Sequence, residues 1–225
     1  MLIIFDLDDT LIQTTDITTP YLLQKLLQFL HKKEVFYNYP EAKKKLFSLH
    51  FRSNTTAEAL ENFFLVYPKG KKFWEESLEL IYSYLEEDVP ISPYVKTLET
   101  LIQLKEKYLL CLVTKGERYI QMRKLKKAGI HREIFSKILV SSLGDKRRCY
   151  QKILLEKRRL PGDTIIIGDR PKQDLQPGKE LGCYTVHIKQ GRGKILQSDF
   201  SDYIIENIKE LPSIVRELSK QKKAG

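Results

Sequence analysis

The chain has 225 residues, of which 42% are hydrophobic and 30% are charged, so it can bury a sizeable core. Its formal net charge of +10 favours anionic partners, which could be phosphorylated metabolites, nucleic acid or acidic membrane surfaces, without choosing among them. Three scattered cysteines exclude a disulfide framework, and no apolar run reaches the roughly 18 to 20 residues that span a bilayer. Because the first apolar residues lead straight into acidic ones, we expect no signal peptide, a cytoplasmic protein and no membrane partner.

The chain opens with a short apolar run at residues 2–5, which predicts a buried strand. No convincing strand follows between residues 13 and 91. Helical patterns fill that interval, at 20–33, 41–50, 55–67 and 73–87, and we expect its many aromatic residues to pack between these helices. The sequence therefore predicts an α-helical cap domain at 13–91, inserted directly after the first strand.

Strand and helix patterns alternate in the rest of the chain. Further strands are predicted where runs are continuously apolar, at 109–113, 137–140, 164–167, 183–188 and, more weakly, 203–205. Helices are predicted between and after them, at 94–107, 117–128, 147–159, 174–181 and 207–218. Alternation of this kind predicts an α/β fold, a doubly wound parallel-sheet (Rossmann-like) core formed by residues 1–12 and 92–225.

Reactive side chains stand at the carboxyl ends of the predicted strands, where open α/β sheets bind their ligands. In chain order they are Asp6, Asp8, Thr114, Lys115, Lys146, Asp169 and Asp174. The aspartates would repel one another in a shared crevice unless a cation neutralised them. Mg²⁺ prefers oxygen ligands and keeps part of its shell for water and phosphate, so we expect it at Asp6, Asp8, Asp169 and Asp174.

These residue types suit phosphoryl transfer, which depends on positioning and on stabilisation of phosphate charge. One of the carboxylates can attack phosphorus and form an aspartyl-phosphate, while the metal and Lys146 oppose the phosphate charge. The Thr114 hydroxyl and the Lys115 amide can donate to phosphate oxygens. Asp8 can protonate the leaving oxygen and later deprotonate the attacking water. Lys152 is an alternative to Lys146, although it should fall on the following helix.

The segments Phe5-Asp-Leu-Asp-Asp-Thr-Leu11, Val113-Thr-Lys-Gly116, the lysine at 146 and Ile167-Gly-Asp-Arg-Pro-Lys-Gln-Asp174 together resemble the four motifs of the haloacid dehalogenase-like (HAD) superfamily. The resemblance implies that Asp6 is the nucleophile and Asp8 the acid/base. It also implies that Mg²⁺ is bound by Asp6, by the backbone carbonyl of Asp8 and by Asp169, with support from Asp174. The helical insert resembles the cap with which many members read their substrate.

The predicted activity is that of a magnesium-dependent phosphatase, a phosphoric monoester hydrolase acting on a small phosphorylated metabolite. A phosphomutase would share every core residue. A haloacid dehalogenase would share Asp6, but that branch typically lacks the second aspartate, so Asp8 argues against it. A non-catalytic nucleic-acid-binding protein would account for the positive charge, but no recognised binding motif accompanies it and we do not expect nucleic acid as a partner.

Overall fold

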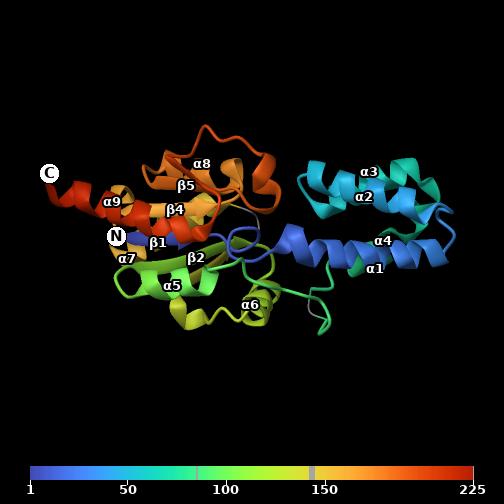
Figure 1. Cartoon of the computed structure of the whole chain (residues 1–225), viewed down its shortest axis with the longest axis horizontal. Helices are drawn as coiled ribbons and strands as arrows, with labels where there is room; N and C mark the ends of the chain where they lie inside the picture. The colour runs from blue at the N-terminus through green and yellow to red at the C-terminus, as the bar shows by residue number, and fades with distance from the viewer. Residues whose placement is uncertain (85, 142–144, 225) are drawn as a thin grey trace. The chain divides into compact units, whose positions relative to one another are not determined.

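The computed structural model describes residues 1–84, 86–141 and 145–224 (Figure 1). It divides into two compact units. The core unit comprises Met1–Thr14 and Ile91–Gly225, and the helical unit comprises Thr15–Pro90. Within the described residues no helix is both long enough and apolar enough to cross a membrane.

The core unit is built on one six-stranded parallel sheet with the order β3-β2-β1-β4-β5-β6. Its strands are β1 (Leu2–Phe5), β2 (Leu109–Lys115), β3 (Lys137–Ser141), β4 (Thr164–Gly168), β5 (Tyr184–Ile188) and β6 (Tyr203–Ile205). Every residue of β1 and β4 is buried, as expected for strands that are covered on both faces. The predicted doubly wound α/β fold is confirmed.

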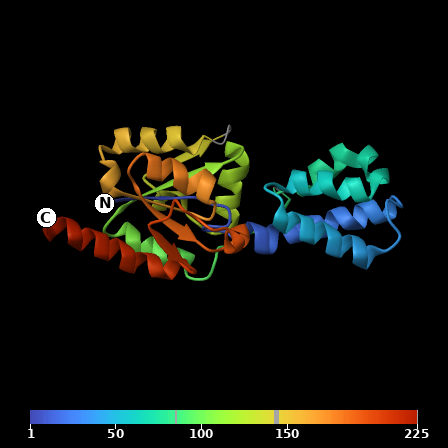
Figure 2. The ribbon, with the colours of Figure 1, turned by 90° about the horizontal axis from the view of Figure 1, so that it is seen from above.

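Helices cover both faces of this sheet (Figure 2). They are α5 (Thr97–Lys105), α6 (Arg118–Lys127), α7 (Lys146–Lys157), α8 (Gln176–Glu180) and α9 (Leu211–Ala224). Figure 2 shows α7 and α8 on one side of the sheet, and α5 and α9 on the other. On the first side, Tyr150 and Ile153 of α7 pack against apolar side chains of β1 and β2 to form a buried cluster.

The order of the strands decides where the site forms. The direction of winding reverses between β1 and β4, and α/β sheets bind ligands beyond the strand ends at such a point. Phe5 of β1 pairs with Ile167 of β4, and the amide of Asp6 donates to the Ile167 carbonyl over 3.0 Å. The first residues after the two strands therefore meet.

The helical unit contains α1 (Thr19–Lys32), α2 (Tyr39–Arg52), α3 (Thr56–Val66) and α4 (Trp74–Ile81). Asn38 and Thr55 begin α2 and α3 by accepting hydrogen bonds from backbone amides three residues later, over 3.1 and 3.0 Å. Leucine side chains of α1 and the aromatic residues of the unit form one apolar core. Tyr37, Phe51 and Tyr82 depart from the predicted packing of aromatic residues, because each is exposed, Tyr37 by 80%.

Three predicted helices are wrong in their bounds. The helix predicted at 207–218 is α9, which begins at Leu211 and ends at Ala224. The helix predicted at 73–87 ends at Ile81, and residue 85 lies outside the described residues. Beyond it, Glu86 and Asp88 pair with Lys25 of α1, which holds the chain in a non-helical path. The helix predicted at 174–181 is instead a wide helical turn at Pro171–Leu175 followed by the short α8.

The chain leaves the core unit and returns to it at neighbouring points. Within the core unit, the Gln13 amide donates to the Ser92 carbonyl over 2.9 Å. Within the helical unit, the Thr18 hydroxyl donates to the Pro90 carbonyl over 2.8 Å. The two ends of the helical insertion are thus joined to each other by one hydrogen bond in the core unit and one in the helical unit.

We expect Gly178→Ala to lower the free energy of unfolding by about 1–3 kcal/mol, because α8 packs tightly on β4. A Cβ at residue 178 would lie 2.4 Å from the Cδ1 of Ile166, whose side chain is fully buried. Gly162→Ala is the matched control, since a Cβ there meets nothing within 4 Å. Equal urea midpoints for the two variants would contradict the expected overpacking.

Candidate active site

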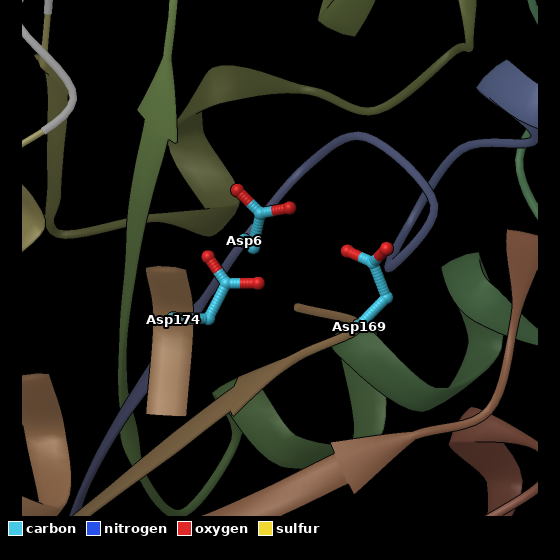
Figure 3. Close-up of side chains that lie close together, drawn as sticks. All are labelled: Asp6, Asp169 and Asp174. Carbon is cyan, nitrogen blue, oxygen red and sulfur yellow. The ribbon is translucent and has the colours of Figure 1, made fainter. Parts of the chain in front are cut away.

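Three carboxylates meet beyond the carboxyl ends of β1 and β4 (Figure 3). Asp6 directly follows β1, Asp169 directly follows β4, and Asp174 lies on the turn at Pro171–Leu175. One oxygen from each of the three lies within 4.8 Å of the others, and all three residues are buried. The predicted residues Asp6, Asp169 and Asp174 are therefore brought together, whereas Asp8 is not part of this group.

Lys146 is the positive charge that faces two of these carboxylates. Its Nζ donates to Oδ1 of Asp6 and, over 2.6 Å, to Oδ1 of Asp174. It is the first residue of α7 rather than a loop residue, and its side chain is only 4% exposed. Burial disfavours the charged lysine, but Asp174 and Asp6 outweigh it and raise the Lys146 pKa well above its usual value. Lys152 lies exposed on α7.

Asp174 is held from two sides. Besides Lys146, the backbone amide of Arg170 donates to its Oδ2 over 2.9 Å. Gly168 makes room for it, because a Cβ at residue 168 would lie 2.5 Å from both the Cβ and the Oδ2 of Asp174. The Tyr150 hydroxyl also donates to the Asp174 carbonyl over 3.2 Å. The orientation of this carboxylate is thus fixed by its surroundings.

The acidic group carries more negative charge than Lys146 neutralises. Burial raises the pKa of Asp6 to about 7, despite the opposing effect of Lys146. Burial, with the nearby charges of Asp9, Asp174 and Asp6, holds the pKa of Asp169 well above its usual value. The buried Oδ2 of Asp169 has Arg170 Nε at 3.3 Å but accepts no hydrogen bond from the described residues. Buried oxygens with surplus negative charge fit a divalent cation such as Mg²⁺, which Asp6 and Asp169 could bind directly.

Asp8 has a different environment from Asp6. Its Oδ1 accepts hydrogen bonds from the Thr14 hydroxyl and, over 2.9 Å, from the Lys124 ammonium. Its Oδ2 accepts one from the Gln121 amide over 3.0 Å. Burial would raise the pKa of Asp8, but the charge of Lys124 and these hydrogen bonds lower it below its usual value. Two aspartates that are two residues apart thus have pKa values shifted in opposite directions.

Thr114 and Lys115 end β2 next to this second carboxylate. The buried Thr114 hydroxyl lies 2.9 Å from Gln121 Nε2, which also donates to the Lys115 carbonyl over 2.5 Å. The side chain of Lys115 is exposed. Thr114 is therefore linked to Asp8 through one amide group, whereas the structure brings no partner to the Lys115 side chain among the contacts that it describes.

Sequence reasoning missed Gln121 and Lys124. Both lie on α6, three residues apart and hence on one face of the helix, but both are buried. A polar pair buried on a helix face is visible only when the helix is placed against its neighbours. In the sequence, Lys124 is one of several lysines in a basic run and carries no separate signal.

The segment Gly191-Arg-Gly193 packs against the site. Gly191 has a φ of +49°, and a Cβ there would lie 2.2 Å from Cγ of Asp9. A Cβ at Gly193 would lie 2.8 Å from the carbonyl oxygen of Asp169. That same carbonyl lies 3.1 Å from Nε2 of the buried His187. A carbonyl only accepts, so Nε2 carries the proton, and His187 supports the end of β4.

Comparison with known proteins identifies the family. The family model described as haloacid dehalogenase-like hydrolase matches residues 3–188. The chain belongs to this family. The resemblance expected from the four motifs is confirmed, and the aspartate after β1 stands at the start of the matched region.

Curated relatives of this haloacid dehalogenase-like hydrolase are phosphatases. A glyceraldehyde 3-phosphate phosphatase of Methanocaldococcus jannaschii is 37% identical over 136 residues, which cover 58% of this chain and 59% of that protein. An N-acylneuraminate-9-phosphatase of Mus musculus is 26% identical over 240 residues, which cover 96% of this chain and 94% of that protein. The first match thus spans about three fifths of the relative's own length.

Solved structures share the fold. A haloacid dehalogenase-like family hydrolase from Xanthomonas campestris superposes with a TM-score of 0.69 at 19% identity, covering 100% of this chain and 98% of the other. At this level of identity the likeness extends to the fold alone.

We expect Asp6→Asn and Asp8→Asn to shift the thermal midpoint of the metal-free protein in opposite directions. With a folded-state pKa of about 7, Asp6 binds a proton that the unfolded chain has lost above about pH 4. Its contribution to stability is therefore present below about pH 4 and lost as pH rises through 7. The neutral Asn removes that loss, and Tm should rise by roughly 5 °C at pH 7.5.

Asp8 has the opposite linkage because its folded-state pKa is lowered. Its contribution is present above the unfolded pKa and is lost as pH falls through the folded one. Asp8→Asn leaves Lys124 buried beside a neutral amide, so Tm should fall at pH 7.5. The check is differential scanning fluorimetry with a chelator present, from pH 4 to 8. Shifts of the same sign for the two variants would contradict the assignment of the charges.

Proposed function

We propose that this protein is a magnesium-dependent phosphatase that hydrolyses a small phosphorylated metabolite through an aspartyl-phosphate on Asp6. One observation carries the proposal: Asp6 lies in a buried acidic group with Lys146, while Asp8 is held apart by its own donors. A nucleophile and a proton carrier need such separate environments, because one attacks phosphorus while the other exchanges a proton with the leaving oxygen.

The proposed reaction has two steps. In the first, an oxygen of Asp6 forms a bond to phosphorus, the bond from phosphorus to the substrate oxygen breaks, and Asp8 donates its proton to the departing alkoxide. In the second, Asp8 takes a proton from a water molecule, whose oxygen attacks phosphorus and releases Asp6 and inorganic phosphate. Asp8 gains the proton for the first step as the substrate binds, because a negative phosphate raises the pKa of a nearby carboxyl group.

Charge and hydrogen-bond donors around the site suit a phosphate group. Lys146 can turn part of its hydrogen bonding from the carboxylates to a phosphate oxygen, and the Thr114 hydroxyl can donate to another. Mg²⁺ held by Asp6 and Asp169 would neutralise phosphate charge. Basic and acidic residues nearly balance within the helical unit, so the net charge of +10 comes from the core unit and attracts anions toward it.

The alternative chemistries of the family are less well supported. A dehalogenase has no leaving alkoxide to protonate, so the three donors that orient Asp8 would have no purpose in its reaction. A phosphomutase would transfer the phosphoryl group from Asp6 to a sugar hydroxyl instead of water. The curated relatives are named for phosphatase activity, which favours water as the acceptor.

We predict Mg²⁺-dependent hydrolysis of p-nitrophenyl phosphate that a chelator abolishes. Asp6→Asn should remove the activity entirely, because no other carboxylate can take its place at phosphorus. Asp8→Asn should lower kcat by about 10²- to 10⁴-fold, the usual worth of a general acid/base. Asp199→Asn, which changes an exposed aspartate, is the matched control. Full activity of Asp6→Asn, or of wild type without any divalent cation, would sink the proposal.

We predict that the preferred substrates are phosphate esters of primary alcohols in polyhydroxylated or carbonyl compounds. Both relatives are named for a substrate of this kind, glyceraldehyde 3-phosphate in one case and an N-acylneuraminate 9-phosphate in the other. Release of inorganic phosphate should be measured over a panel that contains both compounds, together with phosphoserine and a nucleoside monophosphate. Isomerised sugar phosphate without phosphate release would point to a mutase instead.

A further inference from the structure

We propose that Gln121 and Lys124 of α6 are positioning residues that hold the Asp8 carboxylate and the Thr114 hydroxyl in one fixed arrangement for proton transfer. The inference rests on the proposed function, because it assigns these side chains to the acid/base group of that reaction. Neither residue belongs to the four motifs that the sequence resembles, and both are buried.

The Asp8 carboxylate is held at both of its oxygens. Lys124 and Thr14 bind Oδ1, and Gln121 binds Oδ2, so rotation of the carboxylate would break at least one of these contacts. Two of the three donors come from α6, while Thr14 begins the wide helical turn at Thr14–Thr18. A carboxylate held at both oxygens keeps the direction in which it can give or take a proton, and errors near 1 Å in such geometry can cost about 10²-fold in rate.

Gln121 connects this carboxylate to the phosphate-binding end of β2. Its Nε2 lies 3.0 Å from Asp8 Oδ2, 2.9 Å from the Thr114 hydroxyl oxygen and 2.5 Å from the Lys115 carbonyl. The neighbouring Gly116 has a φ of +134°, and a Cβ there would lie 3.3 Å from the same Nε2. The chain after β2 therefore passes close over the Gln121 amide, and one group fixes two elements of the site.

The Gln121 side chain is held there at a cost to stability. Its Oε1 is buried and has no hydrogen-bond partner among the residues that the structure describes. A buried unsatisfied acceptor lowers the stability of the folded state, and an apolar side chain of similar size would avoid that cost. The presence of glutamine at position 121 is therefore explained by the groups that its amide nitrogen orients and not by packing.

Lys124 gives a parallel argument. Its side chain is 6% exposed, and its ammonium lies 2.9 Å from Asp8. Taking a lysine charge out of water carries a large free-energy penalty. A buried ion pair therefore contributes little net stability, and a well-packed apolar residue often stabilises the fold equally well. We instead assign to Lys124 the role of fixing the position of the Asp8 oxygens.

The decisive measurement compares kcat/KM for two leaving groups. p-Nitrophenolate leaves readily without a proton, whereas the alkoxide of a primary-alkyl phosphate needs one. The alkyl probe is glyceraldehyde 3-phosphate, or the primary-alkyl phosphate that the panel finds to be hydrolysed fastest. Displacement of the Asp8 acid should therefore lower kcat/KM far more for the alkyl ester than for the aryl ester. kcat/KM suits this comparison because it depends only on the steps up to departure of the alcohol.

We expect Gln121→Met and Lys124→Met each to lower kcat/KM for the alkyl phosphate by about 30- to 100-fold, and for p-nitrophenyl phosphate by less than about 5-fold. Lys124→Arg should recover part of the loss, because it keeps a charged donor for Asp8. Lys126→Met is the matched control, since it removes an exposed lysine from the same helix and should change neither value. In the Asp8→Asn background, Lys124→Met should cost no further activity.

A purely structural role for these residues would lower both kcat/KM values equally or leave both unchanged, and either result would overturn the inference. Circular dichroism and thermal midpoints identify a variant that fails to fold. If Lys124→Met fails, Gln121→Met and Lys124→Arg still give the ratio between the two substrates. Failure of the proposed function looks different, because wild-type protein would then hydrolyse neither ester.

Discussion

The contact between Lys146 and the carboxylates of Asp6 and Asp174 is the interaction on which the site depends. Without it, three buried carboxylates would face one another with little to offset their repulsion. The lysine stands at the start of α7, and that helix packs on β2 and β3, so the sheet itself determines how far Nζ reaches. The site is therefore a consequence of helix packing as much as of the strand ends.

Lys146 and Arg170 carry two positive charges against three acids, and the remaining negative charge prepares the site for a cation. Burial first, and then the neighbouring carboxylates, raise the pKa values of Asp6 and Asp169 in the metal-free chain. Stability and function thus oppose each other here, because the charge that would attract Mg²⁺ is the charge that burial disfavours. Asp8 escapes this conflict since Lys124 and two neutral donors face it instead.

Patterns local in sequence predicted most of the fold. The apolar run at 2–5 is a strand over just those residues, because a strand buried on both faces leaves an uninterrupted signal. The turn at Pro171–Leu175 was not predictable in the same way, since its shape depends on Asp174 reaching Lys146 and the Arg170 amide. Asp6, Asp169 and Asp174 were suggested by their position after strands. Gln121 and Lys124 were not, because their partner Asp8 lies more than a hundred residues away in the chain.

The paired junction of the helical unit has a consequence for chain entropy. Hydrogen bonds join the two ends of the insertion. The Gln13 amide donates to the Ser92 carbonyl just outside it, and the Thr18 hydroxyl donates to the Pro90 carbonyl inside it. For the core unit, the insertion is therefore a loop whose two ends are already joined. The entropy cost of closing a loop grows only slowly with its length. Lengthening or replacing the segment between these ends would leave the register of the parallel sheet untouched. Changes in the inserted helices should therefore have little effect on the stability of the strands that position the aspartates.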